Sequence, residues 1–239
     1  DVREVTKTIR EAGVMNAIIT SNPDKADFEA VKNYVIKDAV KSVSTSKAEL
    51  YPSEEHKHNV VLMDFGAKQN IIRELNSRGC NVAVMPYDTK AEDILKLGVD
   101  GIMLSNGPGD PAENVGIVEE IKKLIGKVPI FGICLGHQLL ALAMGGETTK
   151  LKYGHRGVNQ PVKNLETGRT YISSQNHGYA VVNESIEKVG GKISYINAND
   201  NTCEGVEYPG KKAFSVQFHP EACSGPKDTA VSYTHLTLP

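Results

Sequence analysis

Short apolar runs alternate with amphipathic stretches along the middle of the chain, from about residue 59 to residue 146. The amphipathic stretches have the three-to-four-residue spacing of helices, and the apolar runs are rich in Val, Ile and Met. This alternation predicts βαβ units, and the almost continuously apolar strands predict a mainly parallel sheet with helices on both faces. The strand-like runs are NVVLMDFG, CNVAVMPYD, DGIMLSNG and VPIFGIC.

The pattern becomes more strand-like after Gly146, and helical spacing becomes rare. We therefore expect antiparallel strands added to the parallel sheet, giving an α/β fold of mixed strand direction. The runs that suggest this are TTKLKYG, RTYISSQ, YAVVN, KISYIN and KKAFSVQFH.

Both ends of the chain differ from this central pattern. Residues 1–13 have helical spacing and end at Gly13, whereas Thr20 to Lys57 is mostly polar and contains one helix-like stretch, ADFEAVKNYVIKDAV. The last residues, VSYTHLTLP, show no helical stripe. The sequence therefore predicts three regions: the end of an earlier domain plus a linker at 1–57, an α/β domain at 58–230, and an atypical tail at 231–239.

Composition narrows the class of protein. The 239 residues are 40% hydrophobic and 23% charged, with a formal net charge of −2, so neither nucleic acid nor another polyanion is an expected partner. No apolar run approaches the roughly 20 residues that span a bilayer, and no secretory leader is visible, so no membrane association is expected. Four widely spaced cysteines favour reduced thiols and a cytoplasmic location.

The strongest chemical signal is Cys134, within Gly132-Ile133-Cys134-Leu135-Gly136, between an apolar strand and a helix. This G-x-C-x-G pattern has the form of a nucleophile elbow, in which flanking glycines allow a sharp turn. The helix N-terminus would stabilise a thiolate, and the Leu135 N–H would face an oxyanion. A buried cysteine that only fills space in the core is the alternative.

A cysteine nucleophile needs a base, and KKAFSVQFHPEA supplies His219 with Glu221 two residues later. A carboxylate on one imidazole nitrogen would fix the tautomer and leave the other nitrogen for the thiol. A solvated His-Pro-Glu turn is the alternative. His137 is nearer in sequence but should point away from the turn, and a metal site formed by Cys203, His219 and Cys223 lacks paired C-x-x-C spacing.

Two further segments would complete a pocket. The loop from Leu104 to Pro111 follows a strand, so it should lie at the same sheet edge as Cys134, with the Gly109 N–H as a second oxyanion donor. It is otherwise a plain turn or a weak phosphate-binding loop. The segment from Ser173 to Val181 offers Asn176 and exposed backbone to a polar substrate, or is a simple hairpin turn.

Three of these motifs together, FGICLGHQ, LSNGPGDP and FHPEA, resemble the class I glutamine amidotransferases. DFGAKQNIIREL, GHRGVNQPV and QNHGYAV are similar to the carbamoyl-phosphate synthase small-chain branch of that family, rather than to the glutaminases of anthranilate, aminodeoxychorismate or GMP synthesis. The resemblance covers about residues 59–228 and implies a flavodoxin-like domain. It also implies that most of an N-terminal domain, with a glutamine-binding serine, lies outside this sequence, and that the tail replaces a terminal helix.

The resemblance implies a glutaminase in which Cys134 attacks the side-chain amide of L-glutamine, His219 transfers the proton and Glu221 supports His219. The ammonia would pass to a large synthase subunit, which would use ATP, Mg and bicarbonate to make carbamoyl phosphate for arginine and pyrimidine synthesis. This chain itself would need no cofactor or metal. The glutamine-binding residues that the resemblance implies are Gly107, Gly109, Leu135, Gln138, Asn176, Gly178 and Tyr179, of which Tyr179 replaces a phenylalanine common in relatives.

Three other functions fit the same motifs. The chain could feed ammonia to a different synthase, or it could be a cysteine hydrolase of esters, lactones or peptides built on the same elbow. It could also be a scaffolding subunit whose triad has lost its use.

Overall fold

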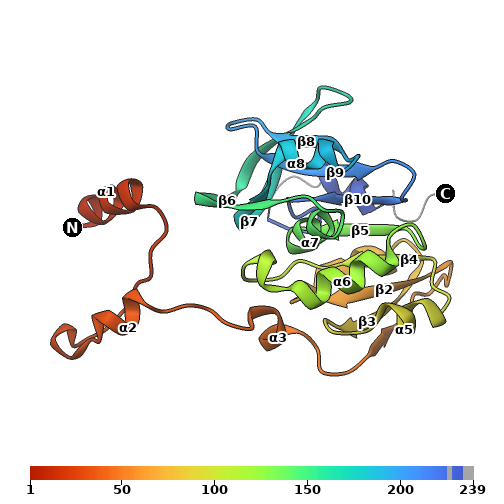
Figure 1. Ribbon diagram of the computed structural model, residues 1–239, viewed down its shortest axis with the longest axis horizontal. Coiled ribbons are helices and arrows are strands. Elements are labelled where there is room, and N and C mark those ends of the chain that lie inside the picture. The colour runs from red at the N-terminus through yellow and green to blue at the C-terminus, as the bar shows by residue number, and fades with distance from the viewer. Residues whose placement is uncertain (225–227, 234–239) are drawn as a thin grey trace.

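A single mixed sheet dominates the computed structural model, which describes residues 1–224 and 228–233. Within these residues ten strands pair in the order β1-β3-β2-β4-β5-β10-β9-β8-β6-β7 (Figure 1). The strands are β1 (Glu49–Tyr51), β2 (His58–Asp64), β3 (Cys80–Pro86), β4 (Gly101–Leu104), β5 (Ile130–Ile133), β6 (Thr148–Asn164), β7 (Thr170–Val181), β8 (Lys192–Asn197), β9 (Cys203–Tyr208) and β10 (Ala213–Val216).

The helices include eight α-helices and three short 3-10 helices in the described part of the chain. None of them has both the length and the apolar character that crossing a bilayer requires. The α-helices are α1 (Val2–Ala12), α2 (Phe28–Lys32), α3 (Ala39–Val43), α4 (Gln69–Asn76), α5 (Ala91–Lys96), α6 (Val115–Leu124), α7 (Leu135–Ala143) and α8 (Asn183–Lys188), and the 3-10 helices are η1 (Pro23–Lys25), η2 (Pro111–Glu113) and η3 (Asp228–Tyr233).

The centre of the sheet is parallel, and its flanks are antiparallel. Strands β3, β2, β4, β5 and β10 pair in parallel, whereas β1 and the strands β9, β8, β6 and β7 add antiparallel neighbours. The predicted α/β fold, a parallel sheet with antiparallel strands added after Gly146, is confirmed.

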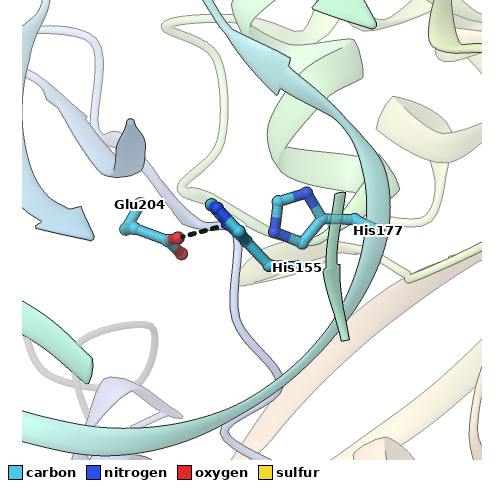
Figure 2. Close-up of side chains that lie close together, drawn as sticks. All are labelled: His155, His177 and Glu204. Carbon is cyan, nitrogen blue, oxygen red and sulfur yellow. Dashed lines mark ion pairs between the residues drawn. The ribbon is translucent and has the colours of Figure 1, made fainter. Parts of the chain in front are cut away.

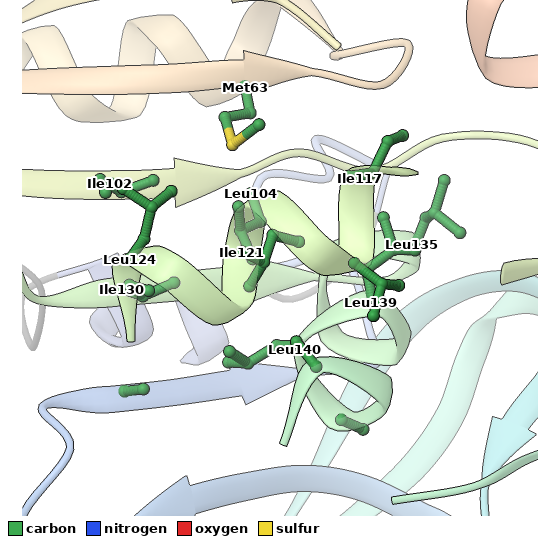
Figure 3. Packing of buried hydrophobic residues seen from close by; sticks show 14 of the residues in the cluster. Met63, Ile102, Leu104, Ile117, Ile121, Leu124, Ile130, Leu135, Leu139 and Leu140 are labelled. Atoms are coloured by element: carbon green, nitrogen blue, oxygen red, sulfur yellow. The ribbon is translucent and has the colours of Figure 1, made fainter. Parts of the chain in front are cut away.

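Both faces of the parallel centre are buried, which explains why its strands read as continuous apolar runs. In β2, Val61 and Met63 join the hydrophobic cluster on one face, whereas Val60 and Leu62 join the cluster on the other. Figure 3 shows the first cluster, with residues of α6 and α7 packed on β2, β4 and β5. Helix α4 covers the opposite face through Ile71, Ile72 and Leu75.

The N-terminal segment differs from the prediction in two respects. Helix α1 ends before Gly13 as expected, but the helix-like stretch at 26–40 is divided into α2 and α3, with Asp38 at φ 49° between them. Neither α1 nor α2 has a buried residue, so no packing offsets the cost of continuing a helix through the β-branched residues near Val35. Neither helix lies on a face of the parallel centre of the sheet (Figure 1), and α1 reaches the sheet at β6, where the Tyr153 hydroxyl donates to the Arg10 carbonyl. The region assigned to the linker also contributes β1 to the sheet.

The predicted tail at 231–239 lies mostly outside the described residues. Residues 231–233 end η3, and Tyr233 is fully buried with its ring edge-on to Phe131, at 5.6 Å between centroids. The chain therefore returns to cover part of the sheet face beside α4.

The first turn of α7 packs on the strands without side chains between them. A Cβ at Gly136 would lie 2.3 Å from the Leu104 carbonyl oxygen. We predict that Gly136→Ala lowers the free energy of unfolding by at least about 2 kcal/mol, because rigid backbone would have to move. Urea denaturation followed by circular dichroism measures this change.

Gly116→Ala is the control, because Gly116 lies on the exposed side of helix α6 with no atom within 4 Å of a new Cβ. It should raise stability by about 0.5–1 kcal/mol through helix propensity. Equal effects of the two substitutions would contradict the close-packing argument.

Candidate active site

The three chemical motifs meet because they follow three neighbouring parallel strands. Strand β5 pairs with β4 on one side and with β10 on the other. Cys134 directly follows β5, the loop from Ser105 to Pro111 follows β4, and His219 lies three residues beyond β10. The carboxyl ends of parallel strands lie at one edge of a sheet, so segments more than 80 residues apart form a single site.

Cys134 adopts the strained backbone of a nucleophile elbow. Its φ of 53° and ψ of −101° lie in a region that residues other than glycine rarely occupy. Neighbouring strands hold this geometry, since the Cys134 N–H donates to the Val216 carbonyl at 2.9 Å and the Gly136 N–H donates to the Ser105 carbonyl at 3.0 Å. Cys134 is the N-cap of α7, where unpaired N–H groups favour negative charge. The predicted elbow is therefore present.

His219 and Glu221, the predicted base and its carboxylate, lie beside Cys134. The His219 ring borders the same cavity as Cys134 and lies close enough to it for Cys134 to raise the pKa of His219, and its Nδ1 lies 2.7 Å from Glu221 Oε1. With Nδ1–H donated to the carboxylate, Nε2 is left for the thiol. The backbone is fixed as well, because the His219 N–H donates to the Ser174 carbonyl at 2.9 Å. The structure therefore places the predicted nucleophile, base and carboxylate in contact.

Electrostatics favour the charged forms of His219 and Glu221, although both side chains are buried. Burial alone would lower the pKa of His219, but the Cys134 and Glu221 side chains outweigh it and raise that pKa to about 9. Burial would raise the pKa of Glu221, but His219 and Lys68 bring it below its usual value. Lys68 Nζ lies 3.4 Å from Glu221 Oε1. At neutral pH the site can thus hold a protonated His219 beside Cys134.

Two cavities are bordered by Cys134. The smaller, of about 110 Å³, is also lined by most of the predicted glutamine-binding residues: Gly107, Gly109, Gln138, Asn176, Gly178 and Tyr179. Leu135 is the exception, since its side chain is packed in the core. A second cavity of about 300 Å³ is bordered by Cys134, Asn176 and His219. A Cβ at Gly107 would meet the Phe65 carbonyl at 2.3 Å, so this loop position requires glycine.

The sequence left the roles of His137 and Gln138 on α7 undecided, and the structure places the two side chains differently. His137 is fully buried with Nδ1 2.8 Å from Ser215 Oγ, and burial lowers its pKa to about 3, so it faces packing as expected and is not the base. Gln138 both lines the smaller cavity and is a packed amide. Its Nε2 donates to the Tyr179 carbonyl at 2.8 Å and to Gln217 Oε1 at 2.8 Å.

The sequence reasoning missed three residues of this site. Lys68 pairs with Glu221, while Arg156 and His177 line the smaller cavity. Arg156 lies opposite Asn176 across the β6–β7 pair, which brings its guanidinium to the pocket. All three occur in DFGAKQN, GHRGVN and QNHGYAV, segments that carried the family resemblance but no individual assignment. Spacing alone could not indicate these roles, because each depends on a cross-strand or loop contact.

One cluster of potential metal ligands occurs among the described residues, formed by His155, His177 and Glu204 (Figure 2). Their nitrogen and oxygen atoms lie within 4.8 Å of one another. Every ring nitrogen in it already faces a hydrogen-bonding group of the protein. We therefore describe the cluster as a hydrogen-bonded network. The proposed combination of Cys203, His219 and Cys223 is not part of it.

The comparison with known families agrees with this geometry. The sequence pattern of the family described as "Glutamine amidotransferase class-I" matches residues 61–237. The chain therefore belongs to the class I glutamine amidotransferase family.

Among curated proteins, the chain is similar to carbamoyl phosphate synthase small chains. The chain is 52% identical over 230 residues to a carbamoyl phosphate synthase small chain of Bacillus cereus, covering 95% of this chain and 62% of that protein. It is 50% identical over 232 residues to the carbamoyl phosphate synthase small chain of Staphylococcus saprophyticus, covering 96% of this chain and 63% of that protein. The chain thus spans less than two thirds of the length of these relatives.

Solved structures share the fold at low sequence identity. A protein from Thermoplasma acidophilum, described as part of a putative GMP synthase, aligns with a TM-score of 0.66 and 21% identity, over 76% of this chain and 92% of that chain. A glutamine amidotransferase from Thermotoga maritima aligns with a TM-score of 0.56 and 19% identity, over 70% and 77%. These two similarities support the fold of the domain.

The carboxylate of Glu221 is predicted to hold the proton on His219. Replacing it by the neutral amide in Glu221→Gln should lower the pKa of His219 from about 9 toward its usual value, because an adjacent anion is lost. Histidine ring signals in an NMR titration measure this pKa. Glu207→Gln, at the exposed position of the otherwise buried strand β9, should leave the titration unchanged, and an unshifted His219 in Glu221→Gln would refute the assignment.

Proposed function

We propose that this chain hydrolyses the side-chain amide of L-glutamine to glutamate and ammonia, as the glutaminase of a carbamoyl-phosphate synthase. The observation that carries the proposal is the contact of Cys134, in its strained turn, with the His219–Glu221 pair. A scaffolding subunit would have no need of a strained cysteine paired with a charged histidine.

The geometry supports covalent catalysis in two stages. The Cys134 thiolate adds to the amide carbon, and the N–H groups of Leu135 and Gly109 are the proposed donors to the oxyanion. The His219 imidazolium then gives its proton to the departing nitrogen, so ammonia leaves and a glutamyl thioester remains. In the second stage His219 removes a proton from water, the hydroxide adds to the thioester, and glutamate is released with the thiol regenerated.

The smaller cavity suits a small zwitterion with a terminal amide. Its lining combines backbone from Gly107, Gly109 and Gly178 with the amides of Gln138 and Asn176. Such groups hydrogen-bond a polar substrate in a fixed orientation, whereas an ester or lipid substrate would favour an apolar lining. The lining therefore favours glutamine over the ester and lactone substrates considered from the sequence.

The identity of the synthase rests on the relatives. Proteins half identical to this chain are named carbamoyl phosphate synthase small chains. We therefore propose the large chain of a carbamoyl-phosphate synthase as the partner that receives the ammonia. The large chain would supply the ATP- and Mg-dependent steps that lead to arginine and pyrimidines, and the assembly would be cytoplasmic.

Cys134→Ala should abolish glutamine hydrolysis while leaving the fold intact, because the nucleophile is lost and the small side chain still fits the turn. Coupled assays for glutamate and ammonia measure the rate, and circular dichroism checks the fold. Cys80→Ala, on buried strand β3, removes a thiol of no proposed catalytic role and should keep the rate. A Cys134→Ala rate above about a hundredth of the original would contradict covalent catalysis at this residue.

The partner is tested separately with the ammonia product. Adding a carbamoyl-phosphate synthase large subunit should give carbamoyl phosphate from glutamine, ATP and bicarbonate, measured by trapping as citrulline, and Cys134→Ala should make product only from added ammonia. Co-purification of a different synthase from source cells, with no binding of the large subunit, would instead support another amidotransferase.

A further inference from the structure

A buried chain of polar side chains links the far side of the β6–β7 hairpin to the cavity beside Cys134. It begins at His155 on β6, which lies between two carboxylates: Nε2 is 2.8 Å from Asp200 Oδ2, and Nδ1 is 3.3 Å from Glu204 Oε1 (Figure 2). Hydrogen bonding to Glu204 raises the pKa of His155, although burial opposes the change. Glu204 is fully buried on β9, and burial raises its pKa, although the hydrogen bond to His155 opposes that change.

Glu204 connects to the cavity through two side chains of β7. Gln175 Nε2 donates to Glu204 Oε2 at 3.0 Å, and Gln175 Oε1 lies 3.0 Å from His177 Nε2. His177 Nδ1 in turn lies 2.7 Å from the Tyr179 carbonyl oxygen. That carbonyl also accepts from Gln138, and both residues line the smaller cavity. The chain of contacts therefore ends on backbone that faces the proposed substrate.

Proton counting shows that Glu204 and His177 depend on each other. Both ring nitrogens of His177 face oxygen atoms, but burial lowers the pKa of His177 to about 4, so the ring has one proton at neutral pH. Turning the Gln175 amide round lets its nitrogen donate to His177, but its oxygen then faces Glu204. Every contact is satisfied only if one additional proton resides on His177 or on Glu204, with Gln175 as the link.

From these contacts we infer that Glu204 and Gln175 are positioning residues for glutamine binding, which act through His177 on the strand segment from Asn176 to Tyr179. The inference rests on the proposed function, because it concerns the same cavity. Neither residue is among those lining the cavity with Cys134. Their effect must therefore pass through the hydrogen bonds, and it should alter substrate binding more than the reactivity of the triad.

The nature of the link distinguishes two substitutions at position 204. Glu204→Met fills the same space but removes the acceptor, leaving buried Gln175 and Asn197 without this partner. Glu204→Gln supplies a permanent N–H to a turned Gln175, whose nitrogen can then donate to neutral His177, so the chain of contacts is restored without the extra proton. A role limited to filling space would not separate these two variants in this way.

The test is the affinity of the full chain for L-glutamine in the Cys134→Ala background, where no turnover occurs, measured by titration calorimetry. Adding Glu204→Met should raise Kd about tenfold or more, and adding Glu204→Gln should keep it within about threefold. Glu207→Met is the matched control, because Glu207 lies on the same strand but is exposed, and it should leave Kd unchanged. With Cys134 intact, KM should follow the same order while kcat stays within about threefold.

An unchanged Kd in Glu204→Met, or an equal loss in Glu204→Gln, would overturn the positioning role. If Glu204→Met does not fold, Gln175→Met cuts the same link while keeping the His155–Glu204 pair, and it must raise Kd to a similar extent for the inference to stand. Failure of Cys134→Ala itself to bind glutamine would refute the proposed function, and the inference with it. That result differs from equal affinities of the two variants, which would refute only the inference.

Discussion

The parallel pairing of β4, β5 and β10 is the constraint on which the rest of this site depends. The pairing aligns the carboxyl ends of three strands whose following residues are distant in sequence. The strained turn at Cys134 is tolerable because both neighbours hold it, the Val216 carbonyl from the β10 side and the Ser105 carbonyl from the β4 side. The same two strands direct the histidine segment and the glycine loop toward the thiol. The same hydrogen bonds therefore hold both the sheet edge and the groups of the site. The backbone is packed closely there, and neither Gly107 nor Gly136 has room for a side chain.

Much of this arrangement could be predicted from local sequence patterns. Alternating strand and helix patterns predicted the α/β core, because each strand is buried on both faces and each covering helix has an apolar stripe. The elbow around Cys134 and the His219–Glu221 pair were likewise visible, since each depends on residues only two positions apart. Lys68 and Arg156 were not assigned roles, because their partners lie on other elements and nothing in their own spacing indicates the contact. The division between α2 and α3 was missed for a related reason: helical spacing was present, but the tertiary packing that would sustain a longer helix is lacking.

Two pairs of charged groups lie near the smaller cavity. The triad itself combines an imidazolium with Glu221, and Lys68 balances that carboxylate from the exposed side. A second, separate pair of His155 and Glu204 lies behind the cavity wall and reaches it only through neutral amides and His177. Buried charges are costly unless paired, so two paired sets near one pocket indicate that the orientation of its lining is closely defined. The Gln175 amide between Glu204 and His177 connects the two through hydrogen bonds and adds no net charge to the cavity.

Cys134 borders both cavities, and this has a consequence for how small molecules enter and leave the site. The smaller is lined by the residues proposed to bind glutamine, whereas the larger is bordered by His219, the proposed base. In the proposed mechanism an acyl group on the sulfur would occupy the first cavity, and the second cavity would give further access to the same atom. A departing gas-sized molecule and an incoming water could then exchange by a route that never crosses the bound acyl chain, so the enzyme would not need to reopen its substrate entrance between the two halves of a turnover.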